Sequence, residues 1–115
     1  MAEDIRAHAR YIRHSPQKVR LVVDLVRGKD VTEALNILRF TPNAAARPVE
    51  KAVSSAMANA EENFGVSRED LYIHKIFADA APTRRWRRFG ARGRFKPILR
   101  RSSHVTVVLR EKEID

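Results

Sequence analysis

Residues 83–96 read TRRWRRFGARGRFK, a run with seven positive charges and no negative charge. Six of the seven are arginines, whose planar guanidinium groups grip phosphate through two hydrogen bonds and stack on bases, whereas lysine offers a point charge. Trp86, Phe89 and Phe95 lie among them. Such rings either stack on unpaired bases or pack across two strands, and both readings stay open. The run predicts contact with a polyanion.

The other residue types that perform chemistry are poorly placed for it. Ser103 beside His104 would be a nucleophile and a base, but adjacent strand residues point to opposite faces of a sheet. Glu61 and Glu62 are neighbouring carboxylates of the kind found on solvated helices. GARGR lacks the glycine patterns of nucleotide-binding loops. Four scattered histidines match no metal-binding spacing: His8, His14, His74 and His104. We expect no enzyme, no metal, no cofactor and no small-molecule substrate.

Composition indicates one globular domain, residues 1–115. A chain of 115 residues buries roughly two-thirds of its unfolded surface, which is enough for one core. No apolar run approaches the roughly 20 residues of a membrane helix, so no membrane partner is expected. The acidic start MAED lacks the pattern of a secretory signal, which favours the cytosol. The chain has no cysteine, which excludes disulfides and thiolate zinc sites.

The positive charge is segregated along the chain. The net charge is +9, yet residues 1–79 hold twelve Lys/Arg against eleven Asp/Glu. Residues 80–110 hold ten Lys/Arg and no acid, and the last five residues have a net charge of −2. The sequence therefore predicts a nearly neutral body, residues 1–79, that carries one basic segment for a polyanionic partner.

The body reads as a short strand over 5–12 followed by helices. Ser15 as an N-cap, Pro16 at the first position and Gly28 just past the end delimit the first helix. Lys18, Arg20 and Arg27 lie opposite its apolar stripe. The stripe follows helical spacing: Val19, Val22, Val23 and Val26.

Two more helices are expected before the chain changes period. One covers 32–40, capped by Thr32 and burying Leu35, Leu38 and Ile37. The next runs from about Asn43 to Asn63 and either starts after Pro48 or bends there. Its alanine-rich stripe is Ala45, Val49, Ala52, Val53, Ala56 and Ala60.

From Leu71 on, apolar residues alternate with polar ones instead of recurring at the helical spacing of 3.6 residues, and this alternation is typical of strands. Segments 71–80 and 102–110 predict an antiparallel hairpin over 71–110 that turns near Gly90 and Gly93, with a basic tip over about 83–97. Pairing Ile73 with a residue near Leu109 makes each arm roughly 50 Å long, at about 3.3 Å per residue. The outer half must then project. The expected fold class is α+β: a small three-helix body packed on a short antiparallel sheet, with a long protruding hairpin.

Several motifs together resemble the bacterial large-ribosomal-subunit protein family L-twenty-two. These motifs are SPQKVRLVVDLVRG, ILRFT, SAMANAEEN, APT and RRSSHVTVVL, and the match runs from about Arg10 to Leu109. The family tip usually reads Pro-Arg-Ala-x-Gly-Arg, and here Phe89 and Gly90 replace its first two residues.

The resemblance implies a body near the mouth of the exit tunnel and a hairpin running inward among segments of 23S rRNA. Implied partners are large-subunit ribosomal RNA, neighbouring large-subunit ribosomal proteins and the nascent polypeptide. Residues expected to bind rRNA are Arg10, Arg13, His14, Ser15, Lys18, Arg20, Arg84, Arg85, Trp86, Arg87, Arg88, Arg92, Arg94, Lys96, Arg100, Arg101, Ser102, Ser103 and His104. Residues expected to line the tunnel are Arg88, Phe89, Gly90, Ala91 and Arg92.

Two other classes of function stay open at this point. The same basic hairpin would suit a DNA-bending architectural protein with arms in the minor groove, a class that usually acts as a dimer. A nuclease or RNA-modifying enzyme would also be basic, although no sequence feature indicates one.

Overall fold

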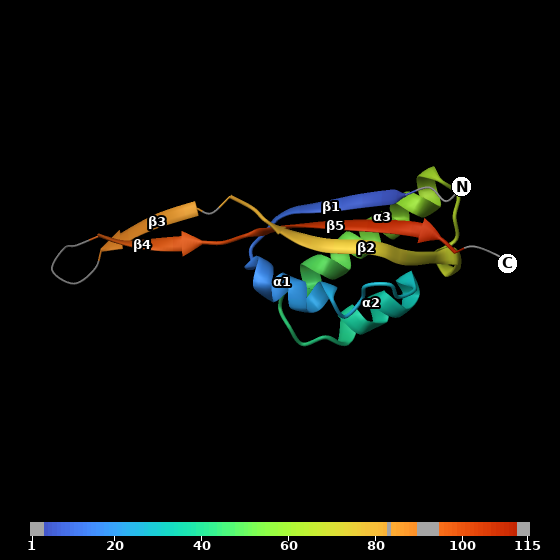
Figure 1. Ribbon diagram of the computed structural model, residues 1–115, viewed down its shortest axis with the longest axis horizontal. Helices are drawn as coiled ribbons and strands as arrows, with labels where there is room; N and C mark the ends of the chain where they lie inside the picture. Colours follow the sequence, from blue (N-terminus) through green and yellow to red (C-terminus); the bar gives the residue numbers. More distant parts are fainter. Residues whose placement is uncertain (1–3, 83, 90–94, 113–115) are drawn as a thin grey trace.

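A computed structural model gives the fold; it describes residues 4–82, 84–89 and 95–112, with side chains for 4–82 and 101–112. In chain order the elements are β1 (Ile5–Ile12), α1 (Pro16–Val23), α2 (Val31–Phe40), α3 (Ala46–Asn63), the 3-10 helix η1 (Arg68–Asp70), β2 (Leu71–Ala80), β3 (Arg84–Phe89), β4 (Phe95–Arg100) and β5 (Ser103–Glu111). One antiparallel sheet has the order β1-β5-β2, and β3 and β4 form a second sheet (Figure 1). We call β1, β2, β5 and the helices the body, and β3 with β4 the arm.

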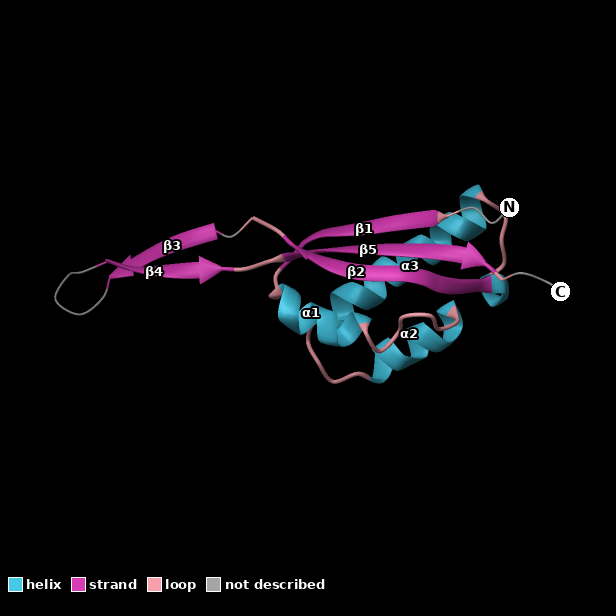
Figure 2. Cartoon of the chain, in the orientation of Figure 1, coloured by secondary structure: helices cyan, strands magenta, loops and turns pink. Residues whose placement is uncertain are grey.

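The three helices pack on one face of the body sheet (Figure 2). Helix α3 lies against β1 and β5, α1 lies against β2, and α2 packs on α3. The apolar stripes expected for the first and third helices are fully buried, which confirms both. From β5 the alternate residues Val105, Val107 and Leu109 complete the core. Each fully buried side chain of this size contributes about 1.5–3 kcal/mol to folding.

Helix α1 begins where expected and ends early. Ser15 takes the N-cap position and Pro16 the first helical position, but the helix stops at Val23. The backbone N–H groups of Leu25 and Val26 then bond three residues back, which tightens the chain into turns. Gly28 closes these turns with φ 78°, a left-handed conformation that suits glycine. Val26 thus reaches the core from a turn rather than from the helix.

The expected cap of the second helix at Thr32 is wrong. Asp30 occupies the N-cap position of α2, and the N–H of Ala34 bonds its carbonyl at 2.8 Å. The reason is tertiary: Asp30 forms a bridge to Tyr72 of β2, and Gly28 and Lys29 exchange backbone hydrogen bonds with Ile73. This pairing holds Lys29 and Asp30 alongside β2, so the helix can start at residue 31. As expected, Leu38 is buried, and Leu35 and Ile37 pack against the core.

Helix α3 begins at Ala46 rather than near Asn43, and Pro48 lies in its first turn. The first four N–H groups of a helix have no partner within the helix, so proline costs little there. Asn43 prepares the start, because its carbonyl and side-chain oxygens accept the N–H groups of Ala46 and Ala45, both at 2.9 Å. The chain therefore needs no bend at Pro48.

The hairpin register is confirmed in the body: Ile73 pairs with Leu109, and pairing continues to Ala80 and Ser103. Beyond that point β3 and β4 project from the body (Figure 1), which confirms the α+β class and the protruding hairpin. The molecule measures 69 × 25 × 19 Å. Its radius of gyration is 17.3 Å, against about 13 Å for a compact domain of this length. The predicted turn at Gly90 and Gly93 lies outside the described residues.

Candidate nucleic-acid interface

The arm pairs positive charge with positive charge. In the β3–β4 register Arg84 stands opposite Arg100, and Arg88 opposite Lys96. Directly opposed like charges destabilise an antiparallel pair, and two strands without a third form no core. The arm contains seven of the nineteen residues that were expected to bind RNA. Of these, Arg84, Arg85, Trp86, Arg87 and Arg88 belong to β3, and Lys96 and Arg100 to β4. Gly90, Ala91, Arg92 and Arg94 lie outside the described residues.

At the root of the arm, two segments that are far apart in sequence, 10–15 and 101–104, lie side by side, and we call them the neck. Ile12 pairs with Ser103, and the buried Ser103 hydroxyl donates a 2.7 Å hydrogen bond to the carbonyl of His14. The N–H of Ala81 bonds the carbonyl of Ser102 at 3.0 Å. The neck therefore brings together seven predicted contact residues: Arg10, Arg13, His14, Ser15, Arg101, Ser102 and His104. It also buries an eighth, Ser103, whose hydroxyl is engaged inside the protein.

An irregularity in β1 places the ring of Tyr11 against His104, within the neck. The β1–β5 register shifts between Ala9 and Ile12, and Tyr11 has φ 57°. Its N–H donates to Nδ1 of His104 at 3.1 Å, and the two rings meet edge to face with centroids 4.7 Å apart. Positive φ is costly for a bulky residue and persists only where the surroundings hold it. Tyr11 was not among the predicted contact residues, because a bulge of this kind leaves no mark in the sequence pattern.

Four of the residues expected to bind rRNA surround the start of α1: Arg13, Ser15, Lys18 and Arg20. Arg13 and Lys18 are exposed, and the Ser15 hydroxyl makes no capping bond to the helix. Arg20 differs, because its Nε donates to the carbonyl of Ala78 at 3.1 Å and so ties α1 to the edge of β2. Arg27 makes a similar bond to Ile76 at 2.9 Å. Arg20 and Arg27 remain exposed, as expected for this face of the helix, but each also donates one hydrogen bond to a carbonyl of β2.

Three of the described groups have shifted pKa values, and a hydrogen bond is the main cause of each shift. A hydrogen bond from Arg110, at 2.5 Å, holds the pKa of Asp4 below its ordinary value, and the same bond raises the pKa of Arg110. A hydrogen bond from Ser67 lowers the pKa of Glu69. All three groups are at the surface. Such shifts are those of structural ion pairs rather than of a tuned acid or base.

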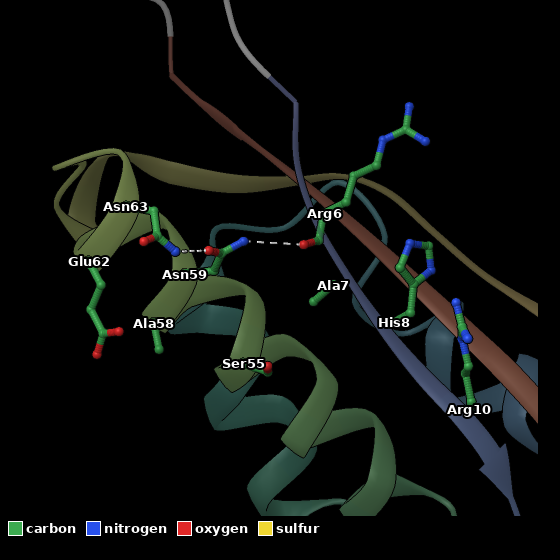
Figure 3. A pocket seen from close by; sticks show the side chains of 9 residues that line it. All are labelled: Arg6, Ala7, His8, Arg10, Ser55, Ala58, Asn59, Glu62 and Asn63. Atoms are coloured by element: carbon green, nitrogen blue, oxygen red, sulfur yellow. Dashed lines mark hydrogen bonds between the residues drawn. The ribbon is translucent and has the colours of Figure 1, made fainter.

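An open groove of about 580 Å³ runs between β1 and α3 (Figure 3). The α3 side offers amide and hydroxyl groups from Ser55, Asn59 and Asn63, and Asn59 donates to the carbonyl of Arg6 at 3.4 Å. None of the groups with a shifted pKa lines the groove. Arg6, His8 and Arg10 of β1 and Glu62 of α3 also line the groove, which is an open, polar surface that can form hydrogen bonds.

In the part of the chain that the structure describes, no cluster of three or more His, Cys, Asp or Glu is arranged to hold a metal ion. Likewise, no helix among the described residues is long and apolar enough to cross a membrane.

The geometry thus presents a basic two-stranded arm, a neck of basic, hydroxyl and imidazole groups at its root, and a neutral body behind them. Comparison with known families gives a match over residues 7–110 to the family described as ribosomal protein L22p/L17e. The match covers most of the chain, arm included. Proteins of this family are structural components of the large ribosomal subunit that bind rRNA and are generally not enzymes. The chain therefore belongs to the ribosomal protein L22p/L17e family.

Proposed function

We propose that the arm of this protein lies embedded in 23S rRNA, and that its tip, residues 88–92, lines the nascent-polypeptide exit tunnel. The single observation that carries the proposal is the arm itself. It projects from the body, its ladder sets Arg84 opposite Arg100 and Arg88 opposite Lys96, and it has no acid to offset them. Phosphates placed around the arm convert this repulsion into attraction, so the arm is stable where RNA surrounds it.

The neck supplies the second part of the interface. Arg13, His14, Ser15, Arg101 and Ser102 are exposed or half-exposed around the root of the arm. They are suited to grip the RNA that flanks the arm where it enters the body. Arg10, Lys18, Arg20 and His104 extend this contact along β1, α1 and β5. Ser103 contributes by fixing the neck, since its hydroxyl is bonded to His14.

A protein held in this way supports assembly of the large subunit, because the arm joins RNA segments that the body alone does not reach. Neighbouring large-subunit proteins would contact the body, and the nascent polypeptide would pass the tip. The proposed location is the cytoplasmic ribosome. Neither a membrane nor a small-molecule substrate has a role in this function.

A salt titration tests the RNA contact. If six to eight phosphates are neutralised, the slope of log affinity for 23S rRNA against log salt is about −0.7 to −0.9 per contact. The double variant Arg87→Gln/Arg88→Gln should reduce that slope by about two contacts. The matched body variant Arg39→Gln/Lys51→Gln, from exposed positions on α2 and α3, should leave it unchanged. Equal slopes for the two variants would refute an arm-centred interface.

The tunnel assignment needs a separate test, which the lack of cysteine makes simple. A single cysteine introduced as Ala91→Cys would carry a thiol-reactive photocrosslinker into assembled ribosomes with a stalled nascent chain. Crosslinks to the nascent chain are expected from this position and not from the control Ser67→Cys beside η1. If Ala91→Cys crosslinks only to RNA, the tip does not line the tunnel.

A further inference from the structure

The body sheet has a second face, which the helices do not cover. Arg6, His8 and Arg10 leave β1 on the side away from α3, whereas Ala7 points toward it (Figure 3). The strand alternation continues on β5 and β2. We call this side the outer sheet face: Arg6, His8, Tyr11, Lys75, Phe77, His104, Thr106 and Val108.

Two cross-strand rows organise its centre. In the first row, Val108 of β5 lies between Arg6 of β1 and Lys75 of β2. Val108 is only 2% exposed although no helix lies on this side, and the aliphatic stems of its two long neighbours are of the right length to cover it. Both charged ends then stand above the sheet, one at each edge.

In the second row, Thr106 lies between His8 and Phe77. Nδ1 of His8 lies 3.2 Å from Oγ1 of Thr106, which holds the imidazole ring on the sheet. Phe77 stands on the other side and is 40% exposed. One row beyond, the paired rings of Tyr11 and His104 continue the surface into the neck.

The charge of this face favours an anion. Asp4, at the far end of β1, contacts Arg110 at 2.5 Å and Arg6 at 3.8 Å, and Asp79 is exposed opposite His104, so Arg6, Lys75 and Arg110 outnumber these two carboxylates. Arg6 and Lys75 flank the rings from opposite edges. Exposed rings between cations fit bases and phosphates, because rings stack on unpaired bases while guanidinium and ammonium groups hold the backbone. Phe77 and Tyr11 are the large exposed rings of this face, since Val108 is buried, and this is less apolar than the buried core of a protein–protein interface.

We propose that the outer sheet face binds unpaired nucleotides of RNA. Phe77 and His8 stack on bases, and Arg6 and Lys75 contact the phosphates between them. The inference rests on the proposed function, since it assumes that the protein is bound to RNA. The arm would then not be the only RNA contact. The body would add a second site, which binds single-stranded RNA with little preference for sequence.

The test uses the full chain and a twelve-nucleotide oligomer of 5-bromouridine, which photocrosslinks to rings stacked on it. After irradiation, mass spectrometry identifies the crosslinked residues. We expect crosslinks at Phe77, His8 or Tyr11 in addition to any in the arm. Phe77→Leu should remove the Phe77 crosslink and weaken binding about fivefold or more, the range of a lost base stack. Because no phosphate contact is lost, the salt slope should not change.

Phe40→Leu is the matched control, since Phe40 is 80% exposed at the end of α2 and lies outside the outer sheet face. It should bind and crosslink as the native chain does. Crosslinks confined to the arm would overturn this inference and leave the arm-centred function standing. Crosslinks at Phe40 as strong as those at Phe77 would also overturn it, because they would show that the RNA contacts exposed rings non-specifically. If the chain fails to bind RNA at all, the proposed function itself is wrong.

Discussion

Removing one hydroxyl from the neck should measurably destabilise the protein. Ser103 is fully buried, and its hydroxyl donates a 2.7 Å hydrogen bond to the carbonyl of His14, 89 residues earlier in the chain. A typical hydrogen bond contributes about 0.5–1.5 kcal/mol, and a buried partner left unsatisfied adds to the loss. His14 is half-exposed, so water can partly replace the donor. We therefore expect Ser103→Ala to lower the free energy of unfolding by about 1–2 kcal/mol.

Urea unfolding followed by circular dichroism measures this loss. With a slope of about 1–3 kcal/mol per molar urea, the midpoint should fall by roughly 0.3–2 M, while the slope itself stays constant. The melting temperature should fall by about 4 °C per kcal/mol. Ser102→Ala, one residue earlier and half-exposed, is the matched control and should change neither value. Equal midpoints for the two variants would show that the bond to His14 does not hold the neck.

Other predictions concern the core, the surface and the arm. Leu38→Ala should lower the free energy of unfolding in urea by about 2–5 kcal/mol, because it empties a fully buried site. Leu25→Ala, at an exposed position, should lower it far less, and equal losses would contradict the core assignment. Asp4→Asn should destabilise the protein slightly at neutral pH. Because folding lowers the pKa of Asp4, the difference should vanish as the pH falls through that lowered pKa, and a difference that persists in strong acid would mean the bond to Arg110 is not its source. Deleting residues 84–96 should leave a cooperative calorimetric transition, since the described core lies entirely in the body; a lost transition would place the arm in the core.

Local patterns were sufficient to predict the fold class and most elements. Valine spacing located α1, alternation located β2 and β5, and the charge map located the arm. The start of α2 was not predictable, because it depends on backbone pairing between 28–30 and 72–73, which local propensity does not record. For the same reason the sequence did not reveal that β1 would pair with β5 rather than with β2.

The sequence indicates the candidate interface by residue type but does not predict its geometry. The arginines and aromatic rings of one acid-free run identify the arm, whichever residues of its two strands are paired. By contrast, the burial of Ser103 and the positive φ of Tyr11 arise where segments about 90 residues apart meet, so no short motif encodes them. The outer sheet face was missed because its members are single residues spread over three strands.

Sedimentation through a sucrose gradient at high salt tests the central claim most directly, namely that rRNA surrounds and holds the arm. Tagged full-length protein in cell lysate should stay with the large ribosomal subunit, because contacts enclosed by RNA resist screening. The variant lacking residues 84–96 should shift to the light fractions at the same salt. Release of the full-length protein into the light fractions, or its recovery with chromosomal DNA, would contradict the account.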